Sequence, residues 1–384
     1  MTSAVTPHFE LPAELPTLNG IRGVAILLVL IHTTNVLTDW SDPLGHGLAR
    51  LAGLGWVGVQ LFFVLSGFLI TRNLLKTQGA AGYFRAFYGR RFLRIFPLYY
   101  ATLLFFFVVL PLVGYVPQGI RDDQPTQIWL WLFLSNWTQQ IGWGGLSLPH
   151  FWSLAVEEQF YLLWPLVVFN RTPKQLLRIC ALIAIVSLGI RCYMVWRSYP
   201  PLLIYTSSLC RMDALAMGAS VAAFAHMPRG LNVMVNRRAW LLGAAVALLL
   251  GGKLIPHGFG MTDPAGQTLG YSMLGAICAL VIAASVASEC LPKGAWGRVF
   301  GFSWLRNVGK YSYAMYVFHA PLGAYVGVVL LERLGWRSHP STAEAFAYEA
   351  AIGVCTYALA WCSYHLLEKH FLKLKRHFVA AAPI

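Results

Sequence analysis

The sequence predicts an all-α membrane protein, a polytopic bundle of about ten transmembrane helices with both termini in the cytoplasm. Of its 384 residues, 57% are hydrophobic and only 11% are charged, a composition that excludes an ordinary soluble domain. The hydrophobic residues gather in runs of roughly 20, the length that a helix needs to cross a bilayer. The lysines and arginines lie mainly in loops on one side of these runs. Composition, run length and charge therefore predict the same fold class.

The expected helices follow one another with only short loops between them. We expect them over residues 18–37, 51–70, 96–113, 150–169, 176–195, 207–225, 240–255, 268–287, 308–331 and 343–366. The apolar segment 128–134 is too short to span, so we expect it to be re-entrant or interfacial. The expected regions are a cytoplasmic N-terminal segment over 1–17, a membrane domain over 18–371 and a basic cytoplasmic tail over 372–384.

The distribution of basic residues predicts the orientation. With the N-terminus in the cytoplasm, 21 of the 29 lysines and arginines lie on the cytoplasmic side and 8 on the other. Anchoring of cytoplasmic loops beside the lipid bilayer explains the net charge of +14 without a nucleic-acid partner. We expect a multi-pass protein of the plasma (inner) membrane. The seven cysteines are scattered with no C-x-x-C pair, so we expect neither a disulfide framework nor a metal site.

The stretch from His150 to Pro165 is polar at its centre, although it leads a hydrophobic run. It places Glu157, Glu158 and Gln159 side by side and then becomes apolar and aromatic. A carboxylate at membrane depth costs roughly 2.5–3.5 kcal/mol on insertion scales, so it needs a compensating role. Acidic residues near a helix N-terminus are also favourable against the helix dipole. Two interpretations stay open: a dipole-stabilised helix start, or a reaction site at the membrane boundary.

Two ionisable residues lie in the first expected span. Arg22 is near its cytoplasmic start, and His32 follows ten residues later, about 15 Å farther along the helix axis. This places His32 near mid-membrane, and a histidine is suited to act as a general base near neutral pH. The structural alternatives are a buried histidine satisfied by hydrogen bonds, and an arginine that anchors the helix at the interface.

A cluster of arginines precedes the third expected span. Arg90, Arg91 and Arg94 lie in it, and Arg72 comes directly after the second span. Arg90 and Arg94 are four residues apart and share one helix face. Because arginine binds phosphate through two parallel hydrogen bonds, the cluster could dock a polyanionic ligand. The positive-inside rule alone also explains it.

Two later spans carry further polar residues. His319 lies in mid-span, with Pro321 two residues later, where the missing backbone N–H frees a carbonyl. This histidine either takes part in a reaction or is simply bonded to a freed carbonyl. Arg211 and Asp213, at the start of the sixth span, are expected to form a local ion pair.

Seven of these segments, in this order, are similar to those of a known family. They are Leu18–Ala25, Leu61–Ile70, Arg90–Pro97, Phe151–Leu162, Arg211–Gly218, Phe318–Pro321 and Leu367–Lys369. On these segments the chain resembles the acyltransferase-3 family of integral membrane acyltransferases. The resemblance covers about residues 18–371, which we therefore interpret as a membrane acyltransferase domain.

The resemblance implies an enzyme that takes an acyl group from a cytoplasmic acyl-CoA, with acetyl-CoA as the expected donor, and delivers it to a hydroxyl. The acceptor would be a carbohydrate, such as a cell-surface polysaccharide or glycolipid, or in one branch of the family a macrolide. The residues implied in catalysis are Arg22, His32, Glu157 and His319. The residues implied in donor binding are Arg72, Arg90, Arg91 and Arg94.

Three features depart from the family pattern. The family has ten residues between the arginine and the histidine of the first span, whereas nine separate Arg22 from His32. The family position therefore falls on Thr33. The polar position before Leu61 is often acidic in the family and is Gln60 here. Many relatives carry a C-terminal extracytoplasmic hydrolase-like domain. This chain ends soon after the tenth span, so we expect transfer to be completed within the membrane domain.

A second class of function stays open. A transporter for an acyl group or a small molecule would use the same buried polar residues as a relay. The sequence shows no matched pair of interrupted hydrophobic segments in two halves, which favours the acyltransferase.

Overall fold

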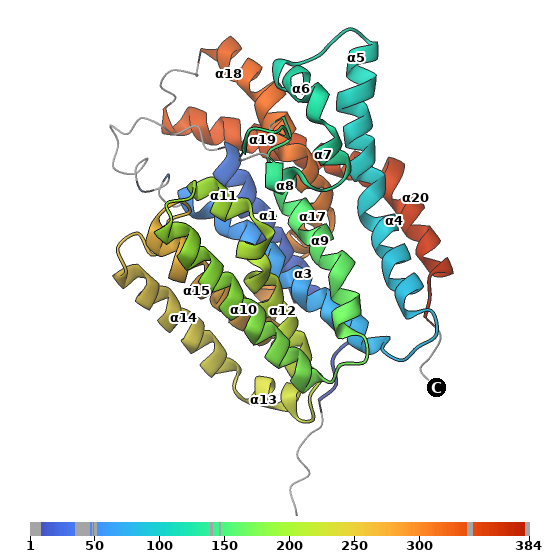
Figure 1. Cartoon of the computed structure of the whole chain (residues 1–384), viewed down its shortest axis with the longest axis vertical. Helices are drawn as coiled ribbons and strands as arrows, with labels where there is room; N and C mark the ends of the chain where they lie inside the picture. The colour runs from blue at the N-terminus through green and yellow to red at the C-terminus, as the bar shows by residue number, and fades with distance from the viewer. Residues whose placement is uncertain are drawn as a thin grey trace, which may run out of the picture.

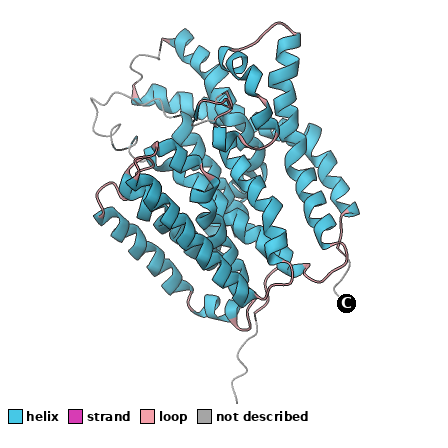
Figure 2. Cartoon of the chain, viewed as in Figure 1, coloured by secondary structure: helices cyan, strands magenta, loops and turns pink. Residues whose placement is uncertain are grey.

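We describe the protein from a computed structural model. The structure describes residues 9–34, 47, 49, 52–138, 141–145, 147–292, 294–335 and 341–380. Every regular element in these ranges is a helix, and Figure 2 draws no strand in them. The predicted all-α class is confirmed.

Ten long helical segments coincide with the ten expected spans. The first five are α1 (Pro16–Thr34), η1 (Leu54–Trp56) with α3 (Val57–Lys76), α4 (Tyr83–Leu104) with η2 (Phe105–Val109) and α5 (Leu110–Leu112), α9 (Phe151–Val168), and α10 (Pro173–Trp196). The next three are α11 (Pro201–Thr206) with α12 (Ser208–Ala225), α13 (Gly230–Asn236) with α14 (Arg238–Leu254), and η5 (Gly266–Gly270) with α15 (Tyr271–Glu289). The last two are α17 (Ser303–Pro321) with η6 (Leu322–Gly327) and α18 (Val328–Leu334), and α19 (Thr342–Ser363) with η7 (Tyr364–Glu368), α20 (Lys369–Lys373) and η8 (Leu374–His377). Residues 35–37 of the first expected span and residue 51 of the second lie outside the described residues.

Eight of these segments, among the described residues, are long and apolar enough to cross a membrane. The α13–α14 pair, bent by 71°, passes as a ninth when its two helices are taken together. The tenth is α9, which is not among these candidates and carries the consecutive polar residues 157–159. A polytopic helical bundle is therefore confirmed, and the charged residues set α9 apart from the other spans.

The remaining described helices are short and lie in the connections. They are α6 (Gln118–Asp123), η3 (Gln124–Thr126), α7 (Ile128–Trp131), α8 (Ser135–Thr138) and α16 (Ala295–Phe300). Residues 128–134 form α7 and the turn before α8, too short to span, as the sequence predicts. The hydroxyl of Tyr99 in α4 donates to the Leu130 carbonyl at 2.7 Å and holds α7 against the bundle.

Local sequence explains where several spans begin. Thr172 caps α10 with its hydroxyl, Gln175 bonds back to the cap, and Pro173 fills the first helical position. Ser341 and Glu344 form the same reciprocal cap at the start of α19. These caps satisfy backbone N–H groups that would otherwise be left without partners at the helix ends.

Close packing of α3 against α12 forms the centre of the bundle. In Figure 1 these two helices lie between α1 and α10, and α12 contacts both α3 and α10 along its length. Gly67 of α3 and Gly218 of α12 permit this approach. A Cβ atom on Gly67 would lie 1.9 Å from the Leu215 carbonyl oxygen, and one on Gly218 would lie 1.9 Å from that of Val64. Small residues at helix interfaces are the usual basis of close packing in membranes.

Both described ends of the chain lie at one end of the bundle. The Phe9 N–H donates to Asn232 of α13, and the C-terminal end lies at the same lower end of Figure 1. The connections α6 and α18 lie at the opposite end. This arrangement fits an even number of crossings, and the positive-inside rule predicts that the lower end faces the cytoplasm.

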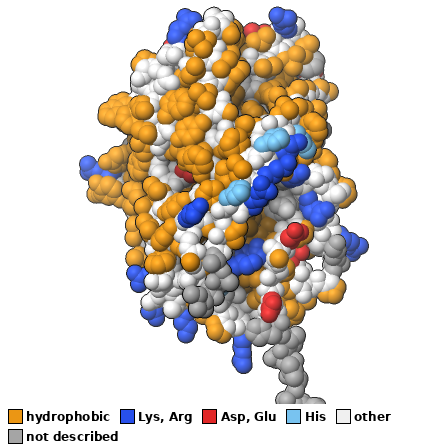
Figure 3. Space-filling view, turned by 90° about the vertical axis from the view of Figure 1, so that its right-hand side faces the viewer, with side chains coloured by type: hydrophobic (Ala, Val, Ile, Leu, Met, Phe, Trp, Pro, Cys, Tyr) orange, Lys and Arg blue, Asp and Glu red, His pale blue; other side chains and the backbone are white. Residues whose placement is uncertain are grey.

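The surface is that of a protein embedded in lipid. Figure 3 shows the face that carries α4 and α20, where hydrophobic side chains cover most of the upper half. Lysine, arginine and histidine side chains gather from the middle of this face downward. The α20–η8 segment contributes Lys369, His370, Lys373, Lys375, Arg376 and His377 to this end. The basic residues therefore lie around the end of the bundle where the chain begins and ends.

Candidate active site

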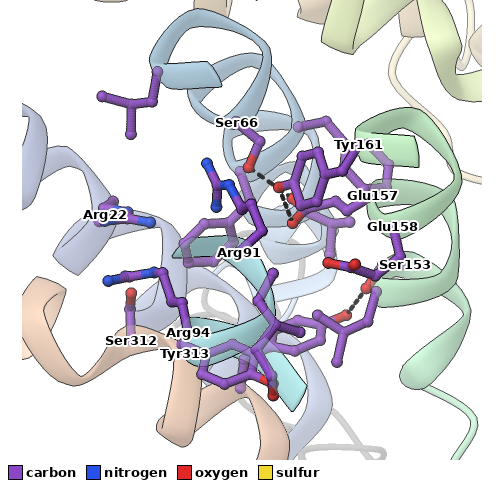
Figure 4. Close-up of a pocket in the computed structure, with 17 residues that line it drawn as sticks. Arg22, Ser66, Arg91, Arg94, Ser153, Glu157, Glu158, Tyr161, Ser312 and Tyr313 are labelled. Carbon is purple, nitrogen blue, oxygen red and sulfur yellow. Dashed lines mark hydrogen bonds between the residues drawn. The ribbon is translucent and has the colours of Figure 1, made fainter. Parts of the chain in front are cut away.

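Five helices enclose a small cavity inside the bundle, which we call the inner chamber. Its volume is about 70 Å³, room for a few water molecules or an acetyl group. Its polar lining consists of Arg22 (α1), Ser66 (α3), Arg91 and Arg94 (α4), Ser153, Glu157, Glu158 and Tyr161 (α9), and Ser312, Tyr313 and Tyr316 (α17). Figure 4 shows these side chains converging from the surrounding helices. Residues that are distant in sequence are thus brought into one polar site in a hydrophobic bundle.

Glu157 is held in place by two hydroxyl groups. Its Oε1 atom accepts a hydrogen bond of 2.8 Å from Ser66, and its Oε2 atom accepts one of 2.6 Å from Tyr161. Tyr161 is one helical turn further along α9, so the spacing alone puts it on the same helix face as Glu157. Figure 4 shows both hydrogen bonds as dashed lines. The carboxylate of Glu157 is fixed in orientation and uses both oxygens as acceptors.

Glu158 lines the same chamber, but one of its carboxylate oxygens lacks a described hydrogen-bond partner. Its side chain points into the pocket in Figure 4, and its Oε1 atom is buried with no hydrogen-bond partner among the described residues. A buried oxygen of this kind costs free energy, which a bound hydrogen-bond donor would recover. The two adjacent glutamates therefore differ: Glu157 accepts hydrogen bonds through both oxygens, whereas Glu158 has a buried oxygen without a described partner.

Three guanidinium groups face these two carboxylates. Arg22, Arg91 and Arg94 all line the chamber, and the Nε atom of Arg22 is buried without a described partner. The guanidinium of Arg91 lies 4.7 Å from the centroid of the Tyr161 ring, which supports it by a cation–π contact. With three positive groups and two negative ones, the chamber is suited to a ligand in which negative charge is present or develops.

Two wider cavities adjoin the chamber and are strongly basic. The first vestibule has a volume of about 570 Å³, and the second about 540 Å³. Arg22 and Arg94 line both vestibules as well as the chamber. The other basic lining residues are Lys76, Arg90, Arg91 and Lys375 in the first, and Arg72, Arg306 and Lys310 in the second. All four arginines that the sequence suggested for donor binding therefore line one vestibule or the other.

Two of these four arginines also make structural contacts. Arg72 donates to the carbonyls of Pro12 and Ala13, so it fastens the N-terminal segment. The Nε atom of Arg90 donates to the Phe378 carbonyl at 2.7 Å and fastens the C-terminal segment. Arg91 and Arg94 thus remain the stronger candidates for contacts to a ligand in the chamber.

His319 lies behind the chamber wall. The residue is 1% exposed, its Nδ1 atom lies 2.6 Å from the Tyr316 carbonyl and so donates to it, and its Nε2 atom has no described partner. The ring centroid of His150 lies 5.0 Å away. Tyr316 separates the pair from the chamber, and its hydroxyl lies 2.5 Å from that of Ser153. His319 therefore contacts Tyr316, which lines the chamber, and does not line the chamber itself.

Like His319, His32 is a predicted catalytic residue that does not line the chamber. It lies near the end of α1, and its Nδ1 atom is 3.3 Å from the Ala52 carbonyl. It lies outside the lining of the chamber and of both vestibules. The Cβ atom of His32 faces Gly55. Gly55 is about one helical turn from Val59, which lines the chamber. Its role as a general base stays a prediction from sequence.

The expected ion pair between Arg211 and Asp213 is wrong. Asp213 pairs instead with Arg191 of α10, at 2.8 Å. The reason is geometric, because residues two apart on a helix point to different sides. Arg211 is completely buried and donates to the neutral Gln60 at 2.6 Å. The ring of Tyr271, 4.5 Å from its guanidinium, is one of four aromatic rings around it.

Sequence reasoning missed several of the residues that complete the chamber. The missed polar residues are Ser66, Ser153, Tyr161, Ser312, Tyr313 and Tyr316. The spacing of four from Glu157 to Tyr161 could have revealed one of them. Ser66 needed the packing of α3 against α9, which no pattern within either segment specifies. The sequence does not single out Glu158 from Glu157, whereas in the structure both residues line the chamber.

Comparison with known proteins decides the family. A sequence profile described as an acyltransferase domain matches residues 15–365. The chain belongs to this acyltransferase family. The resemblance to the acyltransferase-3 family is thereby confirmed, in a chain whose described helices include eight that are long and apolar enough to span a membrane.

Several curated proteins are similar to this membrane acyltransferase. Peptidoglycan O-acetyltransferase OatA of Listeria monocytogenes is 27% identical over 324 residues, 80% of this chain and 49% of the relative. O-acetyltransferase OatA of Staphylococcus aureus is 26% identical over 337 residues, 82% of this chain and 51% of the relative. Putative peptidoglycan O-acetyltransferase YrhL of Bacillus subtilis is 29% identical over 376 residues, 92% of this chain and 54% of the relative. The chain spans about half the length of these relatives. No solved structure matches it.

Proposed function

We propose that this acyltransferase moves an acetyl group from acetyl-CoA to a hydroxyl of a cell-surface carbohydrate. One observation carries the proposal. The inner chamber is lined by Glu158, which has a carboxylate oxygen without a described partner, and by the guanidinium groups of Arg22 and Arg94. Two basic vestibules adjoin it. A proton acceptor and cationic groups at one small cavity are the parts that acyl transfer needs.

The vestibules would hold the donor. Coenzyme A carries several phosphate charges, and vestibules lined by arginine and lysine attract such a ligand. When the phosphates of acetyl-CoA lie in a vestibule, its thioester and acetyl group would lie in the narrow chamber. The chamber, with a volume of about 70 Å³, has room for an acetyl group.

The transfer is a single displacement in this proposal. Glu158 takes the proton of the acceptor hydroxyl while the oxygen forms a bond to the thioester carbonyl carbon. Negative charge develops on the carbonyl oxygen, where Arg22 and Arg94 stabilise it. The carbon–sulfur bond then breaks, and the proton passes from Glu158 to the departing CoA thiolate. Glu157 positions Tyr161 and, through it, Arg91. His319 would assist through Tyr316.

The relatives support the nature of both substrates. Those compared here are named as O-acetyltransferases, and two of the names specify peptidoglycan. This favours acetyl as the acyl group, a carbohydrate as the acceptor and the plasma membrane as the location. The hydrophobic surface and the helical spans agree with a plasma-membrane enzyme.

The test compares surface glycans from cells that carry the wild-type chain, the Glu158→Gln variant or no chain. We expect alkali-labile acetyl groups on the glycan only with the wild type, by mass spectrometry. Purified wild-type protein should also release free CoA thiol from acetyl-CoA. Movement of acetyl-CoA or another solute across proteoliposomes without release of free thiol would favour the transporter and overturn the proposal.

A further inference from the structure

A third cavity, lined by residues of α4 and α9, adjoins the inner chamber. We call it the lateral groove. It has a volume of about 490 Å³ and shares Arg91, Glu158 and Tyr161 with the chamber. The closest neighbours of α4 in the bundle are α7, α17 and the C-terminal helices, so α9 does not close this gap with its backbone. The hydroxyl of Tyr88 in α4 donates to the Leu162 carbonyl of α9 at 2.8 Å and so bridges these two helices.

The outer part of the groove is hydrophobic and exposed. Phe92 is 53% exposed, Leu132 is 55% exposed and Leu162 is 63% exposed. Phe96 and Phe133 continue the same lining inward. These residues lie on two of the ten expected spans and on the short 128–134 segment, so we expect the environment outside the groove to be lipid. Unlike the two vestibules, the groove is suited to hydrocarbon.

The inner end of the groove is polar. Glu158 lines both the groove and the chamber, and its Oε1 atom is buried without a described hydrogen-bond partner. Gln159 lines the groove too, but its amide already donates to the Phe133 carbonyl and to Asn136, at 2.8 Å each. Glu158 therefore supplies the unsatisfied acceptor at the point where the groove meets the chamber. A hydroxyl donor arriving along the groove would satisfy it.

We propose that the lateral groove admits an amphiphilic acceptor from the bilayer: a lipid-linked molecule whose hydroxyl-bearing head reaches Glu158 while its hydrocarbon stays between α4 and α9. This inference rests on the proposed function, in which Glu158 takes the hydroxyl proton. Each part of the ligand meets a matching surface, since the head meets the free carboxylate oxygen and the tail meets exposed aromatic and aliphatic side chains.

The positions of the charged groups favour the acceptor over the donor as the occupant. Arg22 and Arg94, which would stabilise the carbonyl oxygen of the thioester, line the vestibules and not the groove, whereas Arg91 lines both the first vestibule and the groove. Glu158, which would bind the attacking hydroxyl, lines the groove and not the vestibules. Donor and acceptor would thus approach the chamber from different sides and meet inside it.

The probe for this proposal is an alkyl glucoside that carries a photoactivatable diazirine on its chain. The full-length protein is placed in lipid nanodiscs, irradiated with the probe and mapped by peptide mass spectrometry. We expect cross-links on α4 and α9 at the groove, displaced by unlabelled dodecyl maltoside but not by maltose. Leu162→Trp should fill the groove and lower this labelling by about tenfold. Leu166→Trp is the matched control, because Leu166 is one turn away, is 59% exposed and does not line the groove.

Binding of radiolabelled acetyl-CoA is measured on the same samples. Normal donor binding by Leu162→Trp shows that the variant is folded. If the wild-type protein itself did not bind acetyl-CoA, that result would count against the proposed function and not against the groove. Labelling spread evenly over lipid-facing helices, or equal labelling in the two leucine variants, would overturn the groove proposal. So would displacement by palmitoyl-CoA and not by dodecyl maltoside, which would assign the groove to an acyl chain of the donor.

Discussion

The Tyr161 hydroxyl donates a hydrogen bond of 2.6 Å to Glu157, and both residues belong to α9, one turn apart. The Tyr161 ring also lies 4.7 Å from the guanidinium carbon of Arg91. Glu157 is thus linked through Tyr161 to Arg91, one of the arginines proposed to bind the donor. This relationship explains why an acidic residue with both oxygens already bonded can matter to the reaction without touching a substrate.

Glu157→Gln should weaken donor binding more than it slows chemistry. The amide would disturb the hydrogen bonds that orient Tyr161, and Arg91 would lose its support. A hydrogen bond to a charged group contributes about 1.5–3 kcal/mol, so the KM for acetyl-CoA should rise roughly tenfold. Tyr161→Phe should give the same change in KM. Steady-state kinetics with thiol detection make the measurement, and a collapse of kcat with unchanged KM would place Glu157 in the chemical step.

Glu158→Gln should abolish most of the turnover while leaving donor binding intact. The general base would be lost, which lowers kcat by roughly 10²–10⁴. The wild-type rate should fall at low pH, because a protonated carboxyl cannot accept the hydroxyl proton, and any residual activity of the variant should lack this acidic limb. His32→Ala is the decisive comparison and should retain the limb and most of the turnover. The reverse result would return the role of general base to His32, as the sequence alone predicted.

Arg91→Gln and Arg94→Gln should raise the KM for acetyl-CoA by about tenfold each, because each removes a cation that faces the phosphates or the thioester. Added salt should weaken wild-type donor binding and change the variants less. Arg121→Gln serves as the control, since Arg121 lies in α6 at the opposite end of the bundle. Equal effects of all three substitutions on KM would reduce the cluster to general electrostatic attraction.

Reporter fusions test the orientation. Fusions after Arg298 and after Arg376 should both report the cytoplasm, and a fusion after Lys253 should report the other side. The reason is that basic residues concentrate at the end of the bundle where α13 and both described chain ends lie. A fusion after Lys293 would test the same loop, but that residue lies outside the described residues. An extracytoplasmic signal after Arg298 would contradict the ten-span topology.

The sequence by itself determined the membrane bundle, because hydrophobic run length and basic loops are local properties that any span must show. It also determined that α9 is unusual, because carboxylates inside a hydrophobic run are costly wherever they lie. The family resemblance pointed to Arg22 and Glu157, and the structure places both in one chamber. These features can be predicted because each depends on residues that are close together in the chain.

Only the tertiary structure decided which of these residues meet. Ser66 reaches Glu157 because glycines let α3 pack deep in the bundle, and Asp213 pairs with Arg191 of a different helix. His32 lies away from the chamber because ten residues of helix carry it about 15 Å from Arg22. The distinct hydrogen bonding of Glu157 and Glu158 also depends on groups from other helices. Contacts between helices follow from packing geometry, which spacing along one helix does not specify.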